Sequence, residues 1–183
     1  KYTFILYDCL ESRNFASEYL KKWFPKSNYI YLSHYTQGAA LSAISSLAFH
    51  NLKENCPLIF DLADIYFKTD IYPDFVNQFS DSCFIGYSFK SNLPIYSYFD
   101  CDEKFKIKSV AEKKVISCNA SAGVYIYKNS SLFLRALSEV LVNPKNFLTN
   151  DLLYLSNIFN GILKIGYVGS LINVEDYIDY KFI

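Results

Sequence analysis

The sequence predicts an α/β fold: one domain spanning residues 1–183, built in three layers around a mixed, mainly parallel sheet. Two observations lead to this prediction. The chain has 183 residues, of which 51% are hydrophobic, and this is the size of one globular domain with a substantial core. In addition, strand-like and helix-like patterns alternate over residues 2–64, as they do in folds whose strands run parallel.

The N-terminal part of the chain holds these alternating elements. Short apolar runs predict strands, and apolar residues three or four positions apart predict amphipathic helices. Proline residues end the first helical pattern and open the third strand. The expected elements are a strand at Tyr2–Asp8, a helix from Phe15 to Trp23, a strand at Asn28–Ser33, a helix from Gly38 to Leu52 and a strand at Pro57–Phe60.

The second half changes character, because its first strand-like segments are separated by turns and not by helices. These strands are expected to pair antiparallel, so the sheet as a whole is mixed. The expected elements are strands at Cys83–Phe89, Ile95–Phe99, Phe105–Val110 and Ala122–Tyr127, helices at Leu132–Leu141 and Asn150–Phe159, a strand at Lys164–Val168 and an acidic segment at Asn173–Asp179.

Composition excludes several classes of protein. Eighteen basic and eighteen acidic residues give a formal net charge of zero, which argues against a nucleic-acid-binding protein. No apolar run is long enough to span a membrane. Five dispersed cysteines without a C-x-x-C motif are typical of a reduced, cytoplasmic chain. The chain lacks methionine and starts at Lys1, so we expect a further segment in front of it. The apolar C-terminal helices leave open whether the protein forms homo-oligomers.

Two segments at the ends of strands are candidates for a binding site. Open α/β sheets bind ligands beyond the carboxyl ends of their strands. Asp64 follows the Pro57–Phe60 strand, and a carboxylate there can hold Mg²⁺; Asp61 is an alternative ligand, and either could instead cap the turn. The segment Thr36–Ala40 joins a strand to a helix, where Gly38 permits close approach of a ligand and Gln37 offers donors and acceptors to a nucleobase. The alternative is an ordinary loop-to-helix junction without a ligand.

A third candidate segment follows the Phe105–Val110 strand. Glu112 can accept hydrogen bonds from sugar hydroxyls, and Lys113 can pair with a phosphate; the alternative is a solvated pair of charges at a strand end. The small-residue segment Ser117–Gly123 comes next. No serine lies in a Gly-x-Ser-x-Gly motif, so nucleophilic hydrolysis is not supported. The seventeen tyrosines are expected to fill the core and the sheet faces.

Together these segments resemble the sugar-nucleotide pyrophosphorylase (nucleotidyltransferase) family, which has a GT-A-like, Rossmann-related fold, and in particular its branch in bacterial capsule and surface-polysaccharide synthesis. The resemblance runs from Tyr2 to about Tyr177. Its motifs are Gln37-Gly38-Ala39-Ala40, Pro57-Leu58-Ile59-Phe60-Asp61-Leu62-Ala63-Asp64, and the stretch from Val110-Ala111-Glu112-Lys113-Lys114 to Gly123-Val124-Tyr125, of which the last is the most specific.

The resemblance implies an Mg²⁺-dependent enzyme that transfers a nucleoside monophosphate from a nucleoside triphosphate to a sugar phosphate or a similar phosphorylated metabolite. A sugar-1-phosphate oxygen attacks the α-phosphorus, and pyrophosphate leaves. Carried over residue by residue, it assigns catalysis to Asp64 and Lys113, the nucleotide to Gln37, Gly38 and Ala39, the sugar phosphate to Glu112, Lys113, Asn119 and Gly123, and the metal to Asp64 and Asp176.

Two departures from the family pattern keep other functions open. No glycine precedes Gly38, so the Gly-rich triphosphate loop is expected in front of Lys1 or is lacking altogether. The position of the second metal-binding aspartate falls near Ser170, with Asp176 or Glu175 as substitutes. The alternatives are a non-catalytic nucleotide-sugar-binding or regulatory homologue and a GT-A glycosyltransferase, although Asp61-Leu62-Ala63-Asp64 is one residue longer than a D-x-D motif.

Overall fold

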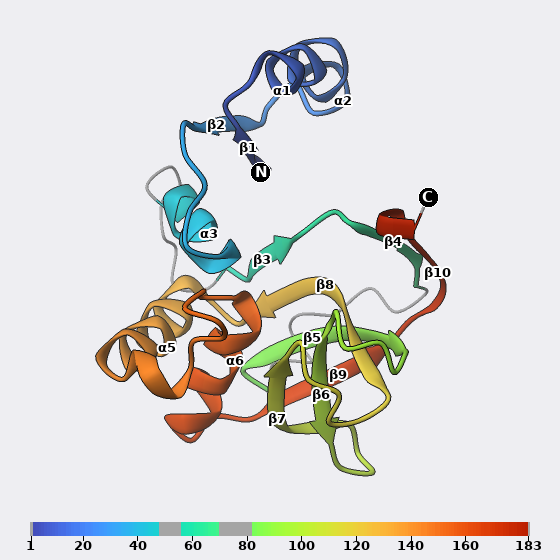
Figure 1. The fold of residues 1–183 in the computed structure, drawn as a ribbon, viewed down its shortest axis with the longest axis vertical. Coiled ribbons are helices and arrows are strands. Elements are labelled where there is room, and N and C mark those ends of the chain that lie inside the picture. Colours follow the sequence, from blue (N-terminus) through green and yellow to red (C-terminus); the bar gives the residue numbers. More distant parts are fainter. Residues whose placement is uncertain (1, 48–55, 70–81, 183) are drawn as a thin grey trace. The chain divides into compact units, whose positions relative to one another are not determined.

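The computed structural model describes residues 2–47, 56–69 and 82–182, and the chain divides into two compact units (Figure 1). The first unit comprises residues 1–51 and 151–153, and the second comprises residues 52–150 and 154–183. Each unit has its own sheet. The mixed α/β character predicted from the sequence is confirmed, because both units combine strands with helices.

The first unit contains two parallel strands and the segments that connect them. Strands β1 (Thr3–Tyr7) and β2 (Asn28–Leu32) pair in parallel, as predicted. The helical stretch between them begins at Leu10, five residues earlier than predicted, because Cys9 caps it by accepting from the Ser12 amide at 3.5 Å. The stretch consists of α1 (Leu10–Phe15), the π-helical turn η1 (Ala16–Leu20) and α2 (Lys21–Trp23).

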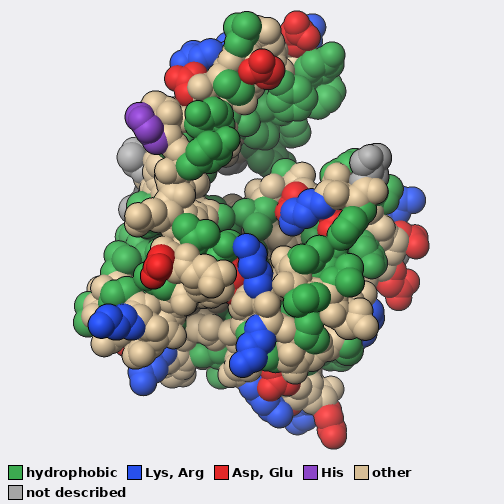
Figure 2. Space-filling view, in the orientation of Figure 1, with side chains coloured by type: hydrophobic (Ala, Val, Ile, Leu, Met, Phe, Trp, Pro, Cys, Tyr) green, Lys and Arg blue, Asp and Glu red, His purple; other side chains and the backbone are tan. Residues whose placement is uncertain are grey.

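These short helices leave an aromatic stripe on the surface of the first unit. Phe15, Tyr19 and Trp23 recur every fourth residue, with ring centroids 5.5 Å apart at each step. All three are exposed, and Figure 2 shows hydrophobic side chains over the part of the first unit that contains α1 and α2. The sequence pattern therefore predicted the helical period correctly, but this aromatic stripe is exposed, and the buried residues of the stretch are Ala16 and Leu20.

Helix α3 (Ala39–Leu47) begins directly after Gly38. Gly38 has a φ of 112°, and a Cβ atom there would lie 2.1 Å from the Leu153 carbonyl oxygen. Only glycine therefore fits this junction. Leu153 holds the junction by donating its amide to the Gln37 carbonyl at 2.9 Å and accepting from the Ala40 amide at 3.1 Å. The rest of the predicted helix, towards Leu52, lies outside the described residues.

The second unit is built on a six-stranded sheet. Its order is β3-β8-β5-β9-β7-β6, and an additional β8–β6 pairing gives the sheet a barrel-like closure. A separate antiparallel pair is formed by β4 and β10. The strands are β3 (Leu58–Asp61), β4 (Ile65–Lys68), β5 (Phe84–Lys90), β6 (Ser97–Cys101), β7 (Lys106–Glu112), β8 (Asn119–Tyr127), β9 (Gly169–Asn173) and β10 (Glu175–Asp179).

The two faces of this sheet have different covers. On one face, Phe159 of α6 (Leu155–Lys164) packs against Phe84, with ring centroids 4.3 Å apart. On the same face, Phe133 of α5 (Ser130–Val142) packs against Tyr127, with ring centroids 4.9 Å apart. On the other face, the β4–β10 pair contributes rings that contact Tyr87 and Phe89 of β5. The central strand β8 is consequently buried along its whole length.

The prediction of a three-layer domain with a mainly parallel sheet is not confirmed. Within the described part of the second unit, β5 and β9 pair in parallel, whereas the other strand pairs of the six-stranded sheet are antiparallel. Strand β3 follows the alternating N-terminal pattern, yet it pairs antiparallel with β8. Strand pairing depends on contacts between distant segments, which a local hydrophobic pattern does not record.

Two predicted boundaries shift in the C-terminal part. The helix predicted at Asn150–Phe159 is α6, which begins at Leu155 because Asn150 and Asp151 both have positive φ angles, of 51° and 59°. The strand predicted at Lys164–Val168 lies before β9, which begins at Gly169, because Lys164 ends α6 and Gly166 has a positive φ angle of 86°. All five cysteines are free. In the described ranges, no helix has the length and apolar character needed to cross a membrane.

Candidate active site

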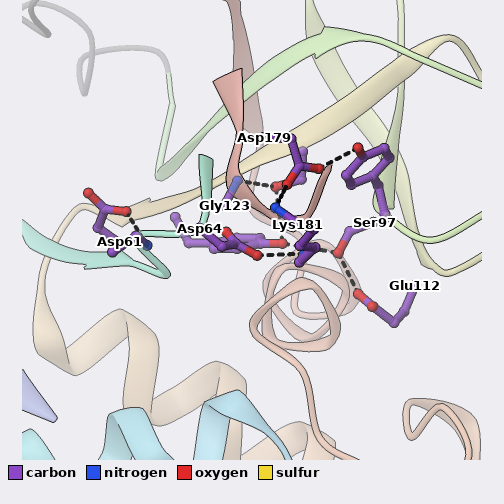
Figure 3. Close-up of polar contacts among 11 residues, drawn as sticks. Asp61, Asp64, Ser97, Glu112, Gly123, Asp179 and Lys181 are labelled. Carbon is purple, nitrogen blue, oxygen red and sulfur yellow. Dashed lines mark hydrogen bonds and ion pairs between the residues drawn. The ribbon is translucent and has the colours of Figure 1, made fainter. Parts of the chain in front are cut away.

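The turn after β3 places two aspartates in different surroundings (Figure 3). The Leu62 amide donates to the Gly123 carbonyl at 3.0 Å, and the Ala63 amide donates to Asp61 Oδ1 at 2.8 Å. Ala63 has a φ of 58°, which lets the chain reverse between the two carboxylates. Burial raises the pKa of the Asp61 carboxyl group, and the nearby charge of Asp64 adds to this effect.

Asp64 has one oxygen that is paired and one that is not. Oδ2 forms an ion pair with Lys181 Nζ at 2.5 Å. Oδ1 is buried and has no hydrogen-bond partner within residues 2–47, 56–69 and 82–182. A Cβ atom at Gly123, which has a φ of 78°, would lie 3.1 Å from Oδ1. A side chain at Gly123 would therefore crowd this oxygen. An unsatisfied buried carboxylate oxygen is the kind of group that a cation or a donor completes.

The C-terminal turn closes around Asp64 from the other side. The Tyr180 amide donates to the Asp64 carbonyl at 3.1 Å, and the Lys181 amide donates to Asp179 Oδ1 at 2.9 Å. Asp179 Oδ2 accepts from the Tyr96 hydroxyl at 2.5 Å. Burial and this bond to Asp179 raise the pKa of Tyr96. Both oxygens of Asp179 are thus used within the protein, and together these bonds hold Lys181 against Asp64.

Glu112 ends strand β7, and its carboxylate is bonded by two hydroxyl groups. Oε2 accepts from Ser97 Oγ, which lies opposite Glu112 in the β6–β7 pairing, and from Ser156 Oγ at 2.8 Å. The next residue, Lys113, has a φ of 52° and donates its amide to the Tyr96 carbonyl at 2.9 Å. Its ammonium group donates to the Tyr154 hydroxyl at 3.0 Å, and this bond raises the pKa of Lys113.

A chain of hydroxyl groups connects the surroundings of Asp64 with Glu112. The Gly123 amide donates to Ser121 Oγ at 3.1 Å, and Ser121 donates to the Tyr125 hydroxyl at 3.1 Å. Ser97 uses its own proton on Glu112, so the Tyr125 hydroxyl donates to Ser97 Oγ at 3.1 Å. The protons of this chain all point towards Glu112, and such chains strengthen their members by mutual polarisation.

Burial and the negative charges of both Glu112 and Asp64 raise the pKa of Tyr125. Burial raises it to about 12, with the charges of Glu112 and Asp64 contributing in that order. The hydroxyl of Tyr125 therefore stays protonated and serves as a neutral donor between the two acidic groups. We define the hydroxyl chain as Ser121, Tyr125 and Ser97, which connect Gly123 to Glu112, together with Ser156, which donates to the same oxygen of Glu112.

The structure brings together four of the predicted site residues. Asp64, Glu112, Lys113 and Gly123 all belong to the second unit and are joined through the contacts described above. Asn119 is buried near the start of β8, where its amide accepts from Lys90 Nζ at 2.7 Å and donates to the Phe99 carbonyl at 3.4 Å. Its hydrogen-bonding groups are thus engaged within the protein.

The predicted nucleotide-binding residues Gln37, Gly38 and Ala39 belong to the first unit. Gln37 is exposed, so its side-chain amide is open to a ligand. Asp176, the predicted second metal ligand, is exposed at a bulge of β10 and has a φ of 49°. It lies three residues before Asp179, or roughly 10 Å along a strand, and Asp179 is the residue paired with Ile65, next to Asp64.

The residues that sequence reasoning missed are those contributed by distant segments: Ser97, Tyr125, Ser156, Asp179 and Lys181. The Gly-x-Tyr pattern at Gly123–Tyr125 was a usable signal for Tyr125. Ser170, at the expected position of a metal-binding aspartate, instead forms a hydrogen bond with Ser82 and accepts from Lys106 Nζ at 3.1 Å.

The residues present fit a divalent cation in part. Among the described residues, Asp64 Oδ1 is a buried carboxylate oxygen without a hydrogen-bond partner. Across residues 2–47, 56–69 and 82–182, however, no three or more His, Cys, Asp or Glu side chains gather as a metal-binding group. Mg²⁺ typically takes one or two protein carboxylates and completes its shell with phosphates and water. Asp64 therefore suits Mg²⁺ as a single protein ligand beside a phosphorylated substrate.

Comparison with solved structures finds the same fold in nucleotidyltransferases. The chain is similar to a nucleoside-diphosphate-sugar pyrophosphorylase from Vibrio cholerae, with a TM-score of 0.80 and 21% identity over 97% of this chain and 75% of that one. The chain is also similar to a putative glucose-1-phosphate thymidylyltransferase from Bacillus anthracis, with a TM-score of 0.70 and 19% identity over 97% of this chain and 69% of that one. For the inositol-1-phosphate CTP transferase from T. maritima, the TM-score is 0.64 and the identity is 15%, over 97% of this chain and 70% of that one. No family model matches the sequence, and no curated protein matches it.

Proposed function

We propose that this protein is a nucleotidyltransferase that joins a nucleoside monophosphate, taken from a nucleoside triphosphate, to a sugar phosphate or a similar phosphorylated metabolite. The observation that carries the proposal is the buried, unpartnered Oδ1 of Asp64 beside Gly123. The fold shared with sugar-phosphate nucleotidyltransferases supports it. By the resemblance of its motifs, we assign the reaction to capsule or lipopolysaccharide synthesis in the cytoplasm.

In the proposed reaction, a phosphate oxygen of the acceptor forms a bond to the α-phosphorus of the nucleoside triphosphate, and the bond from that phosphorus to the β-phosphate oxygen breaks. Pyrophosphate leaves with the electron pair of that bond. No covalent intermediate with the protein is needed, so positioning and charge stabilisation supply the rate enhancement. Mg²⁺ bound through Asp64 would neutralise the charge that develops on the phosphate oxygens.

The side chains of the second unit have separate tasks in this scheme. Glu112 uses Oε2 for the hydroxyl chain, so Oε1 is the oxygen that accepts from acceptor hydroxyl groups. Lys113 carries a positive charge in the same turn and would pair with the acceptor phosphate. Gly123 avoids the crowding of Asp64 Oδ1 that a side chain would cause. The resemblance assigns the base to Gln37, Gly38 and Ala39.

A pyrophosphate-release assay tests this function. Wild-type protein is incubated with Mg²⁺, one of the four nucleoside triphosphates and a panel of sugar-1-phosphates. We expect release with at least one pair of substrates, and the release should depend on both the triphosphate and the acceptor. Hydrolysis of the triphosphate without an acceptor, or no release with any pair, would contradict the proposal.

A non-catalytic, nucleotide-sugar-binding homologue is the second candidate. It is favoured by the ion pair that already neutralises Asp64 and by Ser170 in place of a second acidic residue. This candidate predicts that the protein binds a nucleoside-diphosphate sugar in a calorimetric titration while releasing no pyrophosphate in the assay above.

A further inference from the structure

The position beside Asp64 already contains a positive charge, and it comes from the C-terminal turn. Lys181 Nζ lies 2.5 Å from Asp64 Oδ2. Figure 3 shows the Lys181 side chain directed to Asp64, and it also passes over the Tyr96 ring, with Nζ 5.9 Å from the ring centroid. An ammonium group in this position is attracted both by the carboxylate and by the face of the aromatic ring.

The backbone around Lys181 fixes this placement. Its amide donates to Asp179 Oδ1, and the preceding amide of Tyr180 donates to the Asp64 carbonyl. Asp179 is in turn held by the Tyr96 hydroxyl. Because both oxygens of Asp179 are engaged, this second aspartate beside Asp64 positions Lys181 and is not free to serve as a metal ligand.

Lys181 pairs with only one of the two carboxylate oxygens of Asp64, and Oδ1 is the other. This oxygen is buried and has no hydrogen-bond partner in the part of the chain that the structure describes, although the ammonium group lies on the other oxygen of the same side chain. A divalent cation at Oδ1 would therefore stand within a few ångströms of Nζ, where two positive charges repel each other. The two cations would compete for a single negative charge.

The lysine can leave at small cost. About half of the Lys181 side chain is exposed (49%), and the Asp64 side chain is 30% exposed. Ion pairs with this degree of exposure contribute little to stability, because water replaces the partner. A stronger cation that arrives with a phosphorylated ligand can therefore displace the ammonium group without unfolding the turn.

We propose that Lys181 is a resident counter-cation that competes with divalent metal ions for Asp64, so that a metal ion binds there only when the ammonium group leaves Oδ2. The proposal rests on the proposed function in one respect, because it places a divalent cation at Asp64. It adds the competitor and the segment of the chain, Tyr180–Phe182, that supplies it.

The test is Mn²⁺ binding, measured by electron paramagnetic resonance on the full chain without nucleotide. The variant Lys181→Gln removes the competing charge, and Lys181→Arg keeps it. Lys145→Gln removes one exposed lysine elsewhere in the second unit and controls for the change in net charge. The double variant Asp64→Asn/Lys181→Gln removes the carboxylate itself. Circular dichroism checks that each variant is folded.

We expect Lys181→Gln to bind Mn²⁺ about tenfold more tightly than wild type, the size of effect that one unit charge exerts on a nearby dication. Lys181→Arg and Lys145→Gln should bind like wild type, and the double variant should lose the gain. Equal affinity in wild type and Lys181→Gln, an equal gain in Lys145→Gln, or a gain that persists in the double variant would each overturn the proposal.

The outcome is separable from that of the proposed function. A protein that gains Mn²⁺ affinity as expected but releases no pyrophosphate keeps the competition and loses the catalytic assignment. An active protein whose Lys181→Gln variant shows no change in Mn²⁺ affinity keeps the catalytic assignment and loses the competition.

Discussion

Asp64 and Glu112 belong to the same polar network, but their negative charges are balanced in different ways. Asp64 faces the ammonium group of Lys181 on one oxygen and has an unpartnered second oxygen. Glu112 faces only neutral donors on Oε2, the hydroxyl groups of Ser97 and Ser156. A cation can be exchanged for another cation, whereas hydroxyl dipoles orient a carboxylate without cancelling its charge.

This difference indicates that Asp64 and Glu112 suit ligand groups of different charge. The Asp64 region suits a charged partner, such as a metal ion with its phosphates. The Glu112 region suits a neutral partner that donates hydrogen bonds, such as a sugar ring. Substitutions that remove charge at Asp64, charge at Glu112 or the link between them should therefore have different signatures.

The largest effect is expected from Asp64→Asn. We expect the rate of pyrophosphate release to fall about a hundredfold or more, because a group that stabilises charge at the reacting phosphates is lost. Asp61→Asn is the matched control, since Asp61 lies three residues away in the same turn and bonds the Ala63 amide. Equal losses in both variants would mean that the turn matters and that Asp64 has no special role.

Glu112→Gln should have a smaller effect with a different signature. Because the amide keeps the shape but loses the charge, we expect kcat/KM to fall about tenfold, the value of one hydrogen bond to a charged group. The loss should appear in the KM for the sugar phosphate and leave the KM for the triphosphate unchanged. An increase in the triphosphate KM instead would contradict the assignment of Glu112 to the acceptor.

Tyr125→Phe tests the link between the two regions. Removing the hydroxyl leaves Ser121 without its acceptor and Ser97 without its donor in a buried position. We expect the free energy of unfolding in urea to fall by about 1–3 kcal/mol. Tyr35→Phe, at a tyrosine with 84% exposure, should leave stability unchanged, and equal effects of the two substitutions would contradict the role of the chain.

The smallest effect concerns alkaline pH. The pKa of Tyr125 is raised from 10.0 to about 12 in the folded protein, so above pH 10 the unfolded chain loses this proton first. The contribution of Tyr125 to stability is therefore constant below pH 10 and falls between pH 10 and 12, by at most about 1.4 kcal/mol per pH unit. Urea titrations at pH 9, 10.5 and 11.5 should show a shallower decline in Tyr125→Phe, and identical declines would count against the buried hydroxyl.

The parts that the sequence could predict are the local ones. Asp64 follows a buried strand, and the turn that presents it depends on neighbouring residues. Gly38 and Gly123 stand where positive φ angles are needed, at 112° and 78°. Hydrophobic spacing predicts the strands β1 and β2 and the helix over Ser130–Val142. The parallel pairing of β1 with β2 was predicted from the helical pattern that lies between them.

The parts that it could not predict depend on distant segments. The mainly antiparallel arrangement around β8 arises from pairings that no local pattern records. Lys181 reaches Asp64 because β10 pairs with β4, and Ser97 reaches Glu112 because of the β6–β7 register. Tyr125 was expected to fill the core, and it does so, but its hydroxyl also connects two acidic residues.

The most direct test of the central idea is a crystal structure of the protein with Mn²⁺ and a nucleoside triphosphate, in which anomalous scattering locates the metal ion. We predict an anomalous peak at coordination distance from Asp64 Oδ1, about 2.1 Å for a small divalent cation, with the Lys181 ammonium group withdrawn from Oδ2. A nucleotide bound with its metal ion elsewhere, while Oδ1 keeps no partner and Lys181 stays in place, would contradict it.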